Sequence, residues 1–162
     1  MADAHTLVLG IGNPARGDDG AGRAAVRALC ALHPNRVHVA ETDGEAADVL
    51  ALLEQAASAF VIDACCSGAE AGAIHRFDVS EAPLPQRAFQ LSSHGAGLHE
   101  AIELARALGV LPPRCIVYAI EAARFTIGAP MSELVESAAV EVAARVLAEL
   151  ANAQGAAEPV NG

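Results

Sequence analysis

Short apolar runs alternate along the chain with segments in which apolar residues recur every three or four positions. The runs are typical of strands buried in a sheet, and the periodic segments are typical of helices with one buried face. Strands are predicted at 6–12, 36–41, 59–64, 73–79 and 114–120. Helices are predicted at 18–32, 45–57, 95–109 and 132–150.

This order of elements predicts the α/β class, as a three-layer α/β/α sandwich. A mostly parallel five-stranded sheet would carry helices on both faces. The loop between the third and fourth strands is too short for a crossover helix, so the fourth strand is predicted to run antiparallel to the third. The 162 residues suit one domain, which we place at 1–150, with a frayed tail at 151–162.

The amino-acid composition argues against several classes of function. Twenty acidic residues against ten Arg, with no Lys, give a net charge of −10, which argues against binding to nucleic acid or to anionic lipid. No window resembles a membrane span, and the first residues do not resemble a secretory signal. The four Cys form no CxxC pair, so we expect reduced thiols in a cytoplasmic protein. We also expect the protein to be a monomer.

Polar residues are expected to gather at the carboxyl ends of the parallel strands, where open α/β sheets bind their ligands. The expected residues are Asn13, Asp18, Asp19, Glu41, Asp43, Asp63, Ser92, Ser93, His94 and Glu121. Carboxylates dominate this set, and His94 is its one imidazole.

Asp19, Asp63 and His94 are the candidate metal ligands in this set. Asp63 follows the apolar run 60–62, and a carboxylate at that position must be solvated, paired or bound to metal. Carboxylate with imidazole suits a borderline divalent ion. Other readings remain open: Asp18 and Asp19 could cap the first helix, Asp63 could form a turn, and His94 could enter a helix.

Two rival chemistries are less well supported by the residues. Gly10 and Gly12 loosely fit a dinucleotide-binding turn, but Pro14 removes an amide donor and the two acids after it would repel a pyrophosphate. Cys65 or Cys66 could act as a nucleophile with His94, but an acidic rim disfavours a thiolate, which favours small buried or loop thiols instead. His75 alternates with apolar residues, as a hydrogen-bonded sheet histidine would.

Three segments in order resemble the hydrogenase maturation proteases, which process the large subunit of nickel-iron hydrogenases. These segments are 10–22 (GIGNPARGDDGAG), 60–64 (FVIDA) and 92–98 (SSHGAGL), and the similarity extends over about 6–150. The resemblance implies the sandwich fold and three metal-contacting residues, which fall on Asp19, Asp63 and His94. The first acid is Asp here where relatives have Glu or Asp, and 43–48 departs from the glycine-rich stretch of many members.

The resemblance also implies an activity. The enzyme would be an endopeptidase that removes the C-terminal extension of a hydrogenase large-subunit precursor, and the precursor would bring its own nickel. Asp19, Asp63 and His94 would be catalytic as well as metal-binding, and Gly12, Asn13 and Asp43 would bind substrate. Two alternatives stay open: a metal-independent hydrolase, and a non-enzymatic chaperone that binds the nickel site.

Overall fold

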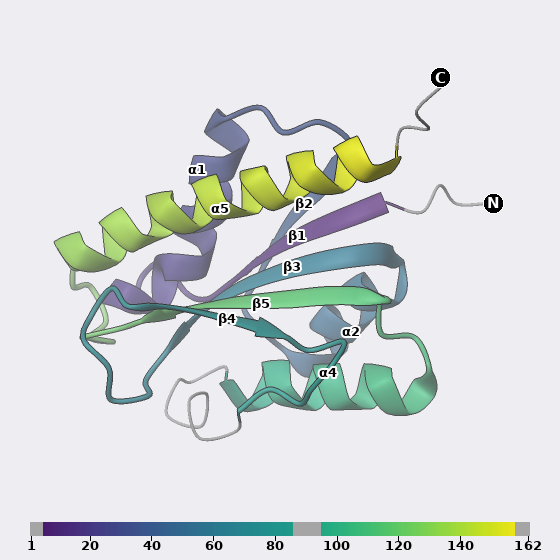
Figure 1. The fold of residues 1–162 in the computed structure, drawn as a ribbon. Helices are drawn as coiled ribbons and strands as arrows, with labels where there is room; N and C mark the ends of the chain where they lie inside the picture. Colours follow the sequence, from purple (N-terminus) through teal and green to yellow (C-terminus); the bar gives the residue numbers. More distant parts are fainter. Residues whose placement is uncertain (1–4, 86–94, 158–162) are drawn as a thin grey trace.

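The computed structural model describes residues 5–85 and 95–157, and it has the predicted three layers (Figure 1). The strands are β1 (His5–Ile11), β2 (Val37–Thr42), β3 (Ala56–Cys65), β4 (Ile74–Asp78) and β5 (Arg114–Glu121). The helices are the 3-10 turn η1 (Gly17–Gly20), α1 (Ala21–Ala31), α2 (Ala46–Glu54), α4 (Gly95–Leu108) and α5 (Glu133–Ala157).

The strand order across the sheet is β2-β1-β3-β5-β4. The first four strands in this order are parallel, and β4 pairs antiparallel with β5, which confirms the predicted fold class and the direction of the fourth strand. However, β5 lies between β3 and β4, so β4 does not neighbour β3. The reason is burial: β5 is buried along nearly its whole length and suits the interior, whereas β4 is only partly buried and suits the edge.

Each face of the sheet is covered by one pair of helices (Figure 1). On one face α1 and α5 pack together over a core that includes Val8, Phe60 and Ile116. On the other face α2 and α4 pack over a core that includes Leu9, Val61 and Val117. These residues alternate along β1, β3 and β5, because successive side chains of a strand point to opposite faces.

Three helix boundaries differ by three residues or more from those predicted. The second helix, α2, ends at Glu54 rather than at 57, and β3 begins at Ala56. The segment predicted as the start of the first helix is the separate turn η1, and neither η1 nor α1 is capped by a side chain, so the capping interpretation of Asp18 and Asp19 is wrong. The last helix, α5, continues through 151–157, beyond the predicted end at 150. None of the helices in 5–85 and 95–157 is both long and apolar enough to cross a membrane.

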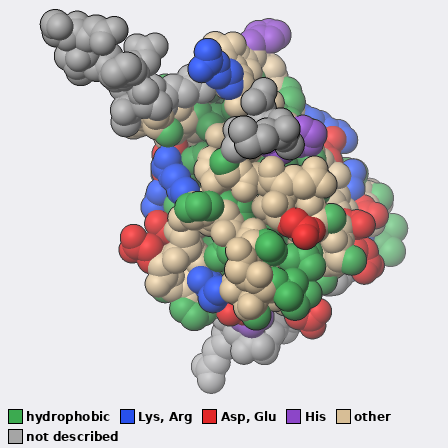
Figure 2. Space-filling model, turned by 90° about the vertical axis from the view of Figure 1, so that its right-hand side faces the viewer, with side chains coloured by type: hydrophobic (Ala, Val, Ile, Leu, Met, Phe, Trp, Pro, Cys, Tyr) green, Lys and Arg blue, Asp and Glu red, His purple; other side chains and the backbone are tan. Residues whose placement is uncertain are grey.

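Charged side chains of both signs are distributed over the face at the amino ends of the parallel strands (Figure 2). Asp and Glu side chains lie there in small separate groups with Arg side chains between them. This face therefore carries no uniform acidic surface.

Gly22, in the first turn of α1, lets the helix approach the sheet closely. A Cβ at this position would lie 2.2 Å from the carbonyl oxygen of Ile62 and 2.4 Å from that of Ile11. Gly22→Ala is therefore expected to destabilise the protein by about 1–3 kcal/mol, because backbone atoms cannot yield as a flexible side chain would.

Urea denaturation of Gly22→Ala checks this prediction. Cys30→Ala, on the exposed side of the same helix, is the control. Helix propensity alone would make Gly22→Ala stabilising by about 1 kcal/mol. A stabilised or unchanged variant would contradict the close approach of α1 to β1 and β3.

Candidate active site

The connection of the strands reverses direction between β1 and β3. From β1 the chain moves outward to β2 on one side, and it then crosses to β3 on the other side. The carboxyl ends of β1, β3 and β5 meet at the left of Figure 1. Ligands of open α/β sheets bind outside the strand ends at this kind of reversal. Asp19, which follows β1, and Asp63, near the end of β3, flank it.

Asp19 is fully buried, and the loop after β1 wraps around it. Its Oδ2 accepts a hydrogen bond from the backbone N–H of Asn13 at 3.0 Å. Gly12 has a φ of 141°, and a Cβ there would lie 1.8 Å from the carbonyl oxygen of Asp19. Only glycine fits this position, so the turn at Gly12 and Asn13 fixes where the Asp19 carboxylate lies.

Asp63 is also fully buried, and it lies inside β3, where it pairs in register with Ala119. The strand continues to Cys65, so the interpretation of Asp63 as a turn residue is wrong. Its Oδ1 accepts the N–H of Ala64 at 2.8 Å, whereas no donor among the described residues reaches Oδ2.

Burial raises the pKa of Asp63 well above its ordinary value, and the negative charge of Asp19 raises it further. Two buried carboxylates that lie close to each other are stabilised by a cation between them. This arrangement fits a metal-binding role for the pair.

The other predicted site residues have different outcomes. His94, with Ser92 and Ser93, lies outside the described residues, directly before α4. Asp43 is near the end of β2, where its Oδ1 accepts a hydrogen bond from Arg23 at 2.7 Å and its side chain is 75% exposed. Gly12, Asn13 and Asp43 all follow strand ends on this edge of the sheet, and their role in substrate binding stays a prediction.

Asp18, next to Asp19, has a structural role. Its carboxylate accepts the backbone N–H groups of Ala123, Arg124 and Ser132 at 2.7–3.0 Å and the Ser132 hydroxyl at 2.9 Å. Burial alone would raise the pKa of Asp18, but these hydrogen bonds outweigh it and hold the pKa below its ordinary value. The contacts join η1 to the loop between β5 and α5.

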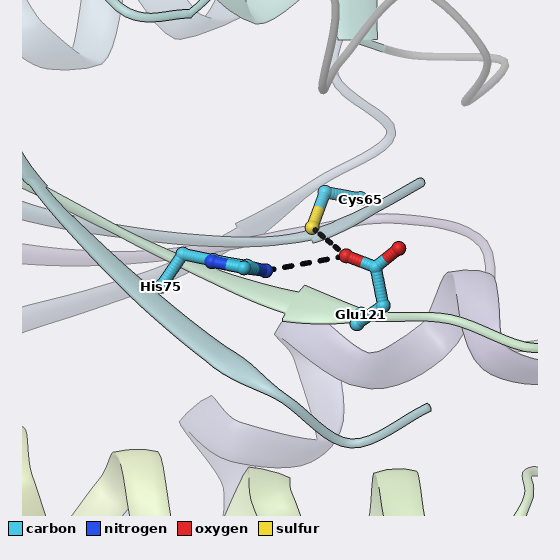
Figure 3. A group of neighbouring side chains, drawn as sticks. All are labelled: Cys65, His75 and Glu121. Carbon is cyan, nitrogen blue, oxygen red and sulfur yellow. Dashed lines mark hydrogen bonds and ion pairs between the residues drawn. The ribbon is translucent and has the colours of Figure 1, made fainter. Parts of the chain in front are cut away.

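Glu121 lies at the end of β5 and joins Cys65 and His75, a combination that sequence reasoning missed (Figure 3). Its Oε2 lies 3.2 Å from both Cys65 Sγ and His75 Nε2. Cys65 and Glu121 are register partners in β3 and β5. The signal was therefore present at residues 65, 75 and 121, but it becomes visible only once the strand order is known. His75 is the hydrogen-bonded sheet histidine that the alternation predicted.

The thiols of this edge are poor nucleophiles. Burial and the Glu121 carboxylate raise the pKa of Cys65 far above its ordinary value. Burial, then Glu121, Asp18 and Asp19, raise the pKa of Cys66. Both thiols are thus protonated near neutral pH, which weakens the hypothesis of a cysteine hydrolase.

Comparisons with known proteins agree with this architecture. In the Escherichia coli hydrogenase maturating endopeptidase HybD, 93% of the chain aligns with 92% of this one at 23% identity, with a TM-score of 0.77. Another Escherichia coli endopeptidase, solved in solution, aligns over the same shares at 21% identity with a TM-score of 0.81. At these identities the two structures establish the shared fold alone.

Sequence comparison gives the family. The hydrogenase expression/formation protein HupD of Rhodobacter capsulatus is 31% identical over 112 residues, which are 68% of this chain. The chain spans about half of the length of HupD, 53%. A sequence model described as hydrogenase maturation protease matches residues 26–149, most of the chain. The chain therefore belongs to the hydrogenase maturation protease family.

Proposed function

We propose that this protein is an endopeptidase that removes the C-terminal extension of a nickel-loaded hydrogenase large-subunit precursor. Family membership supports a protease role in hydrogenase maturation. The observation that carries the finer proposal is the Asp63 carboxylate, which is fully buried beside Asp19 and has an oxygen that no described donor reaches.

The nickel belongs to the substrate in this proposal. Asp19, Asp63 and His94 are its ligands from the protease, and the donor set of two carboxylates and one imidazole suits a borderline divalent ion. Such a set lacks a soft thiolate and leaves coordination positions open, so a precursor that supplies the remaining ligands would bind best. The bound ion would polarise the scissile carbonyl or a water molecule.

The chain's own groups have three tasks. The buried carboxylates would hold the ion at the reversal between β1 and β3. One of them would take a proton from the water that attacks the scissile carbonyl and pass it to the amine that leaves when the peptide C–N bond breaks. The turn at Gly12 and Asn13 orients the substrate backbone, and Asp43 contacts the substrate from the neighbouring loop. We propose that the enzyme does this as a cytoplasmic monomer.

A cleavage assay with two preparations of one precursor, nickel-loaded and nickel-free, tests the proposal. Mass spectrometry is expected to detect the released C-terminal peptide from the nickel-loaded precursor only. Binding of the precursor without peptide release would support the chaperone alternative. Release from nickel-free precursor that alkylation of the thiols abolishes would support the metal-independent hydrolase. Either outcome would overturn the proposal.

A further inference from the structure

Cys65, His75 and Glu121 come from three neighbouring strands and point toward one another (Figure 3). The three candidate ligand atoms, a thiol sulfur, an imidazole nitrogen and a carboxylate oxygen, all lie within 4.8 Å of one another. Two of the separations are 3.2 Å. Atoms bound to one metal at about 2.0–2.3 Å lie at similar separations from each other.

The surroundings orient Glu121 for this arrangement. The backbone N–H groups of Ser67 and Gly68 donate to its Oε1 at 2.7 and 3.0 Å, which leaves Oε2 directed at Cys65 and His75. The Ser67 hydroxyl donates to Oε2 at 2.8 Å. Hydrogen bonds of this kind around a ligating carboxylate fix its direction and strengthen metal binding.

The cluster is also reachable. The side chain of His75 is 29% exposed, and the loop residues Ser67 and Gly68 beside Glu121 are exposed. Cys65 and Glu121 themselves are buried, with 0% and 2% of their surface exposed. The cluster therefore has one side open to solvent and one side closed against the sheet. A metal site with three protein ligands and a free coordination position has the same arrangement.

We propose that Cys65, His75 and Glu121 form a second metal site, which binds a borderline divalent cation of the zinc and cobalt class. The mixed sulfur, nitrogen and oxygen donors match that class better than they match magnesium or calcium. This site shares no residue with Asp19, Asp63 and His94, and it does not rest on the proposed function.

The protons of the cluster balance on binding. The cation takes the place of the thiol proton of Cys65, which leaves to solvent, and His75 carries its remaining proton on Nδ1 so that Nε2 can bind. The Glu121 carboxylate, the Cys65 thiolate and the divalent cation then sum to zero charge. A neutral cluster suits two buried ligands, since a buried net charge is unfavourable.

Cobalt(II) titration of the purified metal-free protein tests the proposal, because cobalt bound to thiolate has a near-ultraviolet charge-transfer absorption. The wild type is expected to develop this band. The band should stop growing once one cobalt ion is bound per cluster of Cys65, His75 and Glu121. Cys65→Ser should lose the band. Cys115→Ser is the matched control, since Cys115 is a buried cysteine of the same sheet outside the cluster, and it should keep the band.

Two further variants make the result decisive. His75→Asn, on the partly buried edge strand, removes one of the three ligands. It should weaken cobalt binding by at least the 10–100-fold or so that loss of an outer-shell partner costs, without removing the thiolate band at saturation. Asp63→Asn should keep the band, whatever it does to precursor cleavage, so failure here and failure of the proposed function are distinguishable. A wild type without the band, or a band that survives in Cys65→Ser, would overturn the proposal.

Discussion

Asp63→Asn is expected to lower cleavage of nickel-loaded precursor by about a thousandfold or more while the protein stays folded. Under the proposed function, the substitution removes an anionic nickel ligand from the reversal between β1 and β3. The asparagine has nearly the same shape, and its Oδ1 can still accept the N–H of Ala64. Loss of activity would therefore reflect the lost charge rather than a lost fold.

The same substitution is expected to leave stability at pH 7 unchanged or raise it by about 1 kcal/mol. Burial, with a smaller contribution from the charge of Asp19, raises the pKa of Asp63 in the folded state. An acid with a raised folded-state pKa contributes most to stability below its unfolded-state pKa, and that contribution is lost as pH rises through the folded-state value. The wild type should therefore lose stability as pH rises through this range, whereas Asp63→Asn should not.

Urea denaturation of both proteins at several pH values measures the difference, and the cleavage assay measures activity. Asp48→Asn, an exposed acid on α2, is the control, and its unfolding free energy should stay within about 0.5 kcal/mol of the wild type. A variant that cleaves normally would show that the reaction does not need Asp63. A variant that is several kcal/mol less stable would show that Asp63 serves the fold.

The position of Asp63 shows what could be predicted from the sequence. An apolar run that ends in a carboxylate identifies both a central strand and a residue whose burial needs a functional reason. The same logic located Asp19 after β1. The placement of these two residues depends only on local sequence and on the rule that parallel strands end at one edge, and the structure agrees with that placement. Their role as metal ligands stays a prediction.

The contacts of Glu121 show what could not be predicted. Cys65 and Glu121 are 56 positions apart, and they meet only because β5 lies between β3 and β4. Strand order depends on which strand buries both faces, a property of the whole sheet. Periodicity within one segment contains no information on it, so the cluster appears in the sequence as three unrelated residues.

The different hydrogen-bond partners of Asp18 and Asp19 could not be predicted for a similar reason. The two residues are adjacent in η1, yet Asp19 accepts a hydrogen bond from Asn13 in the preceding loop, whereas the partners of Asp18 lie 105–114 positions away. In a short turn of this kind, neighbouring side chains point in different directions. Which of the two carboxylates faces the site therefore depends on where the loop between β5 and α5 packs.

Asp18→Ala is expected to reduce the free energy of unfolding at pH 7 by about 2–4 kcal/mol. The substitution removes the acceptor of four hydrogen bonds, and the N–H groups of Ala123, Arg124 and Ser132 lose their carboxylate partner. Hydrogen bonds to a charged group are among the stronger ones, and amides left without a partner add their own desolvation penalty. Asp18→Asn, which keeps one acceptor, should be intermediate.

The pH dependence separates this structural role from a catalytic one. The pKa of Asp18 is lowered in the folded state, so its contribution to stability is present above the unfolded-state pKa and is lost as pH falls through the folded-state value. The difference between wild type and Asp18→Ala should therefore narrow in acid, as urea denaturation at pH 7 and at about pH 3 would measure. Glu141→Ala, which breaks an exposed ion pair with Arg145, should change stability by less than about 1 kcal/mol at pH 7. If Asp18→Ala were no less stable than this control but inactive, Asp18 would belong to the reacting site, and its assignment as the residue that joins η1 to the loop before α5 would be wrong.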